Sequence, residues 1–254
     1  MPDAAAWLGA LAIGLSLGLL GSGGSILTVP VLVYLLGQDE KTAIAGSLFV
    51  VGTIAAAGGL QFAHGKRVDW RSVALFGVPG MAGTYGGAWL GGRVSGTLQL
   101  AVFAAVMLLA AVLMVRPPVG DDPEGRRHPF RVGMDGLAVG ALTGFVGVGG
   151  GFLIVPALVL LGGLPMHLAV GTSLVIIALK SFTGFAKYVA VLDRLGLELD
   201  WGVLLTVAAV GAVGSGVGRA LGARVPQAQL RRGFAAFLVV VGLWILWRSL
   251  PKLL

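Results

Sequence analysis

The chain has 254 residues, of which 57% are hydrophobic and 11% charged, and its formal net charge is +7. Soluble domains contain roughly 25% charged residues, so this composition argues against a water-soluble fold and predicts an all-α protein with several membrane spans. The absence of cysteine excludes disulfides, thiolate metal sites, iron–sulfur clusters and c-type haem.

Two sets of apolar segments follow each other along the chain. The first set falls at about 4–20, 26–37, 42–63, 71–90 and 97–115, and the second at about 133–148, 151–163, 168–190, 201–221 and 232–248. The N-terminus has no positively charged region, so we interpret the segment from Ala4 as a retained membrane helix rather than a cleaved signal. We therefore expect a first transmembrane repeat at 1–115, a cytoplasmic linker at 116–132 and a second repeat at 133–254.

The two sets contain the same glycine-rich phrase. "GLLGSGGSILTVP" at 18–30 and "GFVGVGGGFLIVP" at 144–156 align at an offset of 126 residues, as do Ser47-Leu48 and Ser173-Leu174. After five inserted residues, Asp69-Trp70 aligns with Asp200-Trp201, and Gly80, Gly83, Gly87 and Gly91 align with Gly211, Gly214, Gly218 and Gly222. This order indicates an internal duplication, which is the usual construction of a secondary transporter.

Lys and Arg predict that the two repeats are inverted. The stretches rich in Lys and Arg are 64–71, 116–131 and 222–232, whereas those near 38–41, 91–96 and 189–200 each contain one such residue. If the rich stretches are cytoplasmic, as the positive-inside rule requires, the segments alternate correctly only when each glycine-broken pair enters and leaves on one side. Each repeat is then a glycine-tipped helical hairpin followed by three transmembrane helices. The positive charge is explained in this way, so we expect no nucleic-acid partner.

The glycine tips are the first candidate for a substrate site. Backbone that leaves a helix inside a membrane is tolerated only in protein or beside a wet cavity, and free N–H groups there favour anions. The candidate substrate-binding residues of the tips are Gly21, Ser22, Gly23, Gly24, Ser25, Gly147, Gly149, Gly150 and Gly151. The hydroxyls of Ser47, Thr172 and Ser173 face the same cavity in this interpretation. Close glycine packing without a ligand, and Ser/Thr bonds to their own helices, remain alternatives.

Lys180 completes the candidate site. It lies about ten residues from either end of its helix, where a cation is costly and marks a functional site by default. No Asp or Glu occurs in 4–38, 42–63, 71–115, 137–190 or 201–247, so we expect an anionic substrate, with no metal and no cofactor. A lysine that snorkels to the interface is the alternative.

Two other patterns bear on the class of protein. The Gly83-Gly87-Gly91 and Gly214-Gly218-Gly222 stripes predict close helix packing, within the subunit or in a homodimer. No H-E-x-x-H, P-loop or G-x-S-x-G motif occurs, which argues against an enzyme.

The duplicated phrases, followed by "AVGTSL", resemble the TauE/SafE sulfite exporter family over nearly the whole chain. The resemblance implies a multi-pass protein of the cytoplasmic (inner) membrane, in contact with lipid, that moves sulfite, sulfoacetate or related sulfur-containing anions. An anion channel with the glycine tips as a fixed filter is the main alternative. A membrane scaffold without transport and a cation or metal carrier are others, the last disfavoured by the lack of intramembrane carboxylates.

Overall fold

The computed structural model describes residues 4–20, 25–115, 129–147, 151–158, 164–222 and 227–249, and every regular element in these ranges is helical. The first half contains α1 (Ala4–Leu20), α2 (Ser25–Pro30), the π-helical turn η1 (Val31–Leu35), α3 (Glu40–His64), α4 (Trp70–Ser72), the π-helical turn η2 (Val73–Gly77), α5 (Val78–Gly91) and α6 (Gly96–Val115). The second half contains α7 (Pro129–Val146), α8 (Gly151–Pro156), α9 (Met166–Leu195), α10 (Trp201–Gly222) and α11 (Gln227–Ser249). The prediction of an all-α fold is confirmed.

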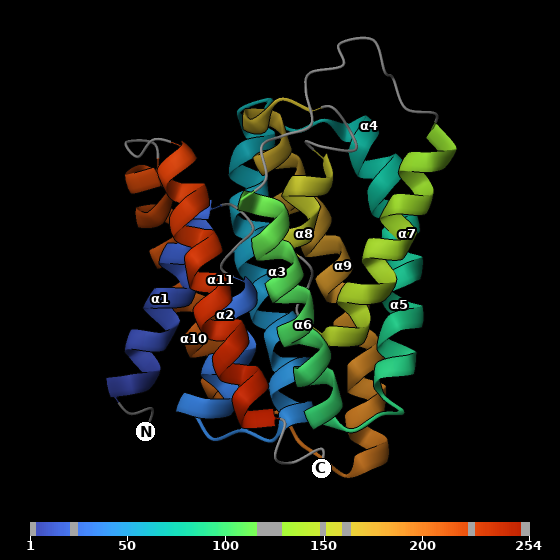
Figure 1. The fold of residues 1–254 in the computed structure, drawn as a ribbon, viewed down its shortest axis with the longest axis vertical. Helices are drawn as coiled ribbons and strands as arrows, with labels where there is room; N and C mark the ends of the chain where they lie inside the picture. The colour runs from blue at the N-terminus through green and yellow to red at the C-terminus, as the bar shows by residue number, and fades with distance from the viewer. Residues whose placement is uncertain are drawn as a thin grey trace.

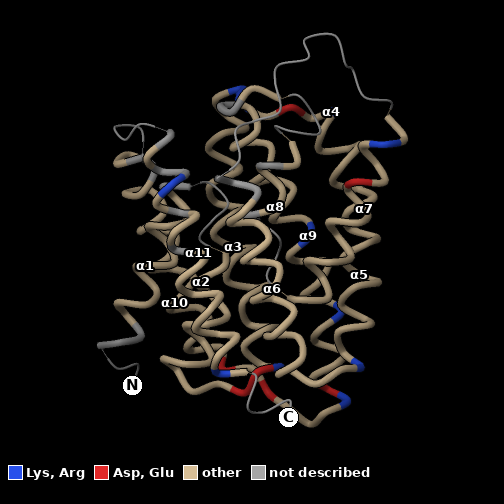
Figure 2. Tube along the Cα trace, viewed as in Figure 1, with Lys and Arg blue, Asp and Glu red and all other residues tan. Residues whose placement is uncertain are grey.

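The surface of the bundle fits a membrane. The spans Glu40–His64, Leu168–Leu195 and Trp201–Gly218 are long and apolar enough to cross a bilayer. Large apolar side chains point outward along the helices, and those of Leu8, Val213 and Trp247 are 70–71% exposed. Most charged residues of the described ranges lie toward the two ends of the bundle (Figure 2). An outer surface of this kind needs lipid to cover it, which supports a membrane protein.

The helices of the two halves of the chain pack against each other in pairs. The most extensive helix pairs are α1 with α10, α5 with α7, α3 with α9 and α6 with α11, so each pair joins one helix of the first half to one of the second (Figure 1). The buried core is therefore shared by the two halves.

Glycine allows α5 and α7 to approach until their backbones are in contact. A Cβ at Gly83 or Gly87 would overlap backbone atoms of α7 around Leu137 and Ala141. The prediction that the stripe through Gly83 and Gly87 serves close packing is confirmed, and its partner is a helix of the same chain.

The direction of the helices can be followed from their contacts. Leu48 of α3 lies beside Gly184 of α9, and Gly58 lies beside Leu174, so α3 and α9 run antiparallel. In both contacts a leucine Cδ1 lies 3.3 Å from the position that a glycine Cβ would occupy. Leu48 and Gly58 align with Leu174 and Gly184 at the 126-residue offset of the repeats, so the two contacts join equivalent residues.

A second pair of contacts shows the same relation. Gly14 of α1 packs against the backbone of Gly211 in α10, and Gly140 of α7 packs against the backbone of Gly80 in α5. Gly14 and Gly140 are equivalent in the aligned repeats, and so are Gly80 and Gly211.

Candidate functional site

The helices stop at the two glycine phrases. α1 ends at Leu20 and α2 begins at Ser25, while α7 ends at Val146 and α8 begins at Gly151. The predicted site residues Gly21, Ser22, Gly23, Gly24, Gly149 and Gly150 lie between these ends, outside the described residues.

Gly147 is described, and its backbone requires glycine. Its φ is +76°, in the left-handed region, and its amide donates to the Thr143 carbonyl at 2.9 Å, as in a helix C-cap. A Cβ at this position would also overlap the side chain of Ile44 in α3. The second glycine phrase is thus a tight stop packed directly against α3.

Ser47 and Gly147, two of the predicted site residues, are in contact. The Ser47 hydroxyl lies 2.7 Å from the Gly147 carbonyl oxygen and 2.9 Å from that of Ile44 in its own helix. Its single proton is shared between these two acceptors. This bond ties α3 of the first half to the end of α7 in the second.

A buried polar network also satisfies the end of α7. The Gln99 side-chain amide donates to the Phe145 carbonyl and to the Tyr188 hydroxyl, which itself donates to Phe145 at 3.1 Å. The Lys41 amine donates to the Gly91 carbonyl at 2.7 Å and to the side-chain oxygen of Gln99. The last carbonyls of a helix have no partner within the helix, and here α6 and α9 supply one. Sequence reasoning missed this network, although Lys41 and Gln99 are polar residues in or beside apolar segments.

Thr172 and Ser173 are buried but already engaged. The Thr172 hydroxyl accepts from the Asp69 amide at 2.9 Å, just before α4. The Ser173 hydroxyl donates to the Val170 carbonyl of its own helix at 2.8 Å. Ser25 is buried at the start of α2. A ligand at Ser173 would compete with the bond to its own helix.

Lys180 is fully buried, and its amine makes no hydrogen bond within the described part of the chain. The amine lies 5.9 Å from the centre of the Phe76 ring, and the Cβ position at Gly80 is 3.2 Å from the lysine Cδ. The side chain therefore packs between α9 and the η2–α5 segment and does not snorkel to an interface. The Lys180 side chain thus lies beside Phe76 and Gly80, whereas Ser47 lies against the end of α7.

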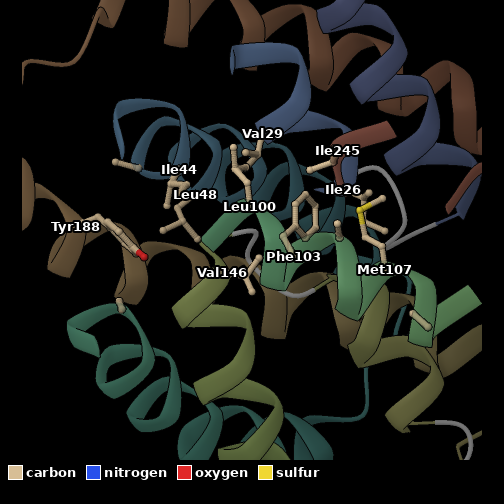
Figure 3. Packing of buried hydrophobic residues seen from close by; sticks show 14 of the residues in the cluster. Ile26, Val29, Ile44, Leu48, Leu100, Phe103, Met107, Val146, Tyr188 and Ile245 are labelled. Atoms are coloured by element: carbon tan, nitrogen blue, oxygen red, sulfur yellow. The ribbon is translucent and has the colours of Figure 1, made fainter. Parts of the chain in front are cut away.

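The residues next to the two breaks share one hydrophobic cluster. Ile26, just after the first break, and Val146, at the end of α7, belong to it together with Phe103 and Met107 of α6 (Figure 3). The short helices α2 and α8 also contact each other. The described residues on either side of the glycine phrases thus lie in a common region of the bundle.

A pocket opens beside the first break. It is lined by α1, α3, α9 and α10, with Gly18, Gly58, Gln61, Leu174 and Ser215 among its residues. Its lining is mostly apolar, with Gln61 and Ser215 as its polar side chains. Because Gln61 is three residues from the end of α3 at His64, the pocket lies toward the end of the bundle that carries the 64–71 loop.

Comparison with known proteins identifies the family. The family model described as "Sulfite exporter TauE/SafE" matches residues 6–245. A "Probable membrane transporter protein" of Xylella fastidiosa (strain 9a5c) is 33% identical over 253 residues, which cover 95% of this chain and 94% of the relative. "Probable membrane transporter protein YunE" of Bacillus subtilis is 31% identical over 67% of this chain and 72% of its own. "Probable membrane transporter protein MJ0441" of Methanocaldococcus jannaschii is 26% identical over 92% of this chain and 93% of its own.

No solved structure matches the chain. The chain belongs to the TauE/SafE sulfite exporter family, as the resemblance of its glycine phrases implied. Family and relatives together support a membrane transporter.

Proposed function

We propose that this protein is a secondary transporter that moves small sulfur-containing anions, such as sulfite or sulfoacetate, across the cytoplasmic membrane. The description of its family names sulfite, and the interior of the bundle contains the amine of Lys180, which can pair with an anion. The proposed site lies between the two glycine phrases, Gly21–Ser25 and Gly147–Gly151, with Ser47, Thr172, Ser173 and Lys180.

The observation that carries the proposal is the buried amine of Lys180. Burying an ionised amine costs several kcal/mol unless a charged or polar partner compensates. The amine has no hydrogen-bond partner in the described ranges, and an anionic substrate would supply both charge and acceptors. The arrangement fits a transporter whose empty site is electrostatically incomplete.

Two further features support an inverted-repeat architecture. α3 and α9 are equivalent in the aligned repeats and run antiparallel, as expected when a two-fold axis in the membrane plane relates the repeats. Such a two-fold axis would also exchange the equivalent contacts Leu48–Gly184 and Gly58–Leu174. In transporters of this construction, substrate binds near the midplane at the interface between repeats.

Thermal unfolding of purified protein in a panel of anions tests the substrate class. A bound anion stabilises the folded state by RT ln(1 + [L]/Kd), or about 2.7 kcal/mol at a concentration of 100 Kd. We expect sulfite or an organosulfonate to raise Tm more than chloride, nitrate or acetate at equal ionic strength. Equal shifts for all anions would contradict the proposed specificity.

A further inference from the structure

The pocket beside the first glycine phrase has a counterpart in the second half of the molecule. The repeat offset places Lys180 at the position of Ile54, Gly184 at that of Gly58, and Thr84 at that of Ser215. Ile54, Gly58 and Ser215 all line the open pocket.

The counterpart is closed. The Cβ position at Gly184 lies 3.1 Å from Thr84 Cγ2, so α5 is packed onto α9. At the equivalent place only Leu174 atoms lie within 4 Å of the Cβ position at Gly58, so the Ser215 side chain of α10 stands further from α3. Two contacts that the sequence makes equivalent are thus closed in one half and open in the other.

We propose that the closed Thr84–Gly184 contact conceals an anion-binding pocket, the counterpart of the open pocket, which contains Lys180 and opens to the opposite side of the membrane when the Gly58–Ser215 gap closes. This inference rests on the proposed function in taking Lys180 as the anion's partner. The occupant is a small oxyanion, because the positions equivalent to the lining of the open pocket carry more hydrogen-bond donors than that lining does.

The donors follow from the repeat offset. Thr143, Thr183 and Lys187 stand where the open pocket has Leu17, Ala57 and Gln61. In the closed packing the hydroxyls of Thr84, Thr143 and Thr183 donate to carbonyls of their own helices, at 2.8, 3.1 and 2.8 Å. Hydroxyls bonded in this way can rotate toward a ligand, whereas the amine of Lys180 has no such bond to give up.

The two arrangements provide a physical basis for alternating access. A two-state equilibrium responds to a ligand that binds one state better than the other. An anion that pairs with Lys180 favours the state in which the amine is reachable. Closure of the Gly58–Ser215 gap then excludes water from the first pocket.

Paired cysteines can lock each state, because the chain has no native cysteine. In Thr84→Cys/Gly184→Cys the side chains meet across the closed contact, at a separation suited to a disulfide. Gly58→Cys/Ser215→Cys is the matched pair at the equivalent positions of the open pocket. Both are oxidised in membranes, and uptake of radiolabelled sulfoacetate is measured before and after reduction. Sulfoacetate is used instead of sulfite because sulfite cleaves disulfides.

We expect both pairs to cross-link, the second more slowly because its closed state must first form, and each cross-link to abolish uptake until it is reduced. Failure of the second pair to cross-link, or full uptake through the oxidised first pair, would overturn the inference. In a separate Ser215→Cys variant, added sulfoacetate should slow labelling by a membrane-impermeant maleimide, since it favours the state in which the first pocket is closed; unchanged labelling also counts against the inference. Cross-linking itself needs no substrate, so a protein that cross-links at both pairs but transports no sulfur-containing anion contradicts the proposed function and not the two-state geometry.

Discussion

At the scale of single residues, Lys180 should lower the stability of the empty protein and create its anion affinity. Lys180→Met retains the bulk and removes the charge, so we expect the anion-induced rise in Tm to disappear. The Tm without anion should stay the same or increase, because the variant removes a buried amine that has no hydrogen-bond partner in the described part of the chain. Lys180→Arg should keep part of the anion response.

Arg194→Met is the control for Lys180→Met, since it removes a positive charge from the exposed end of the same helix. It should leave the anion response intact. Anion stabilisation of Lys180→Met equal to that of the parent would remove Lys180 from the site.

Ser47 is the second residue with a measurable role. Ser47→Ala leaves the buried Gly147 carbonyl without its side-chain donor, which should lower the free energy of unfolding by about 1–3 kcal/mol. Thr53→Ala on the same helix is the matched control, because that hydroxyl donates to the Phe49 carbonyl of its own helix. Thermal unfolding of both variants measures the loss, and an equal loss of stability in the two would show that the Ser47–Gly147 hydrogen bond contributes no more than a bond within one helix.

At the scale of helices, the contact between α5 and α7 depends on glycine at selected positions. Gly83→Ala places a Cβ against the α7 backbone, which cannot move without separating the helices, so we expect a severe loss of folded protein. Gly86→Ala on the same helix meets no atom within 4 Å and should be neutral or stabilising, by up to about 1 kcal/mol of helix propensity. Yield and Tm in detergent measure both, and equal tolerance of the two substitutions would refute the packing.

The helices themselves could be predicted from sequence because the signals are local. Apolar runs and the two glycine phrases predicted where the long helices lie, and the aligned glycines predicted the close packing at Gly83. The π-helical turn η2, which divides the expected segment 71–90, was not predicted. The network of Lys41, Gln99 and Tyr188 could not be predicted, since its side-chain partners lie 58 and 89 residues apart in sequence. The hydrogen bond from the Asp69 amide to Thr172 could not be predicted for the same reason, because the two residues become neighbours only when the chain folds.

At the scale of the whole molecule, the proposed inversion of the two repeats predicts the membrane topology. Single cysteines at Val119, in the linker, and at Gly196, after α9, should react with an impermeant thiol reagent from opposite sides. Labelling from one side for both positions would contradict the inversion. Each variant must retain anion uptake, which shows that the labelled protein is folded.

Uptake of radiolabelled sulfite or sulfoacetate into proteoliposomes that contain the purified protein tests the central claim most directly. We expect uptake that saturates with anion concentration, is competed by other sulfur-containing anions, and is lost in Lys180→Met but kept in Arg194→Met. Flux that rises linearly without saturation would identify a channel, and absence of flux for every sulfur-containing anion in the panel would contradict the account of this protein as their transporter.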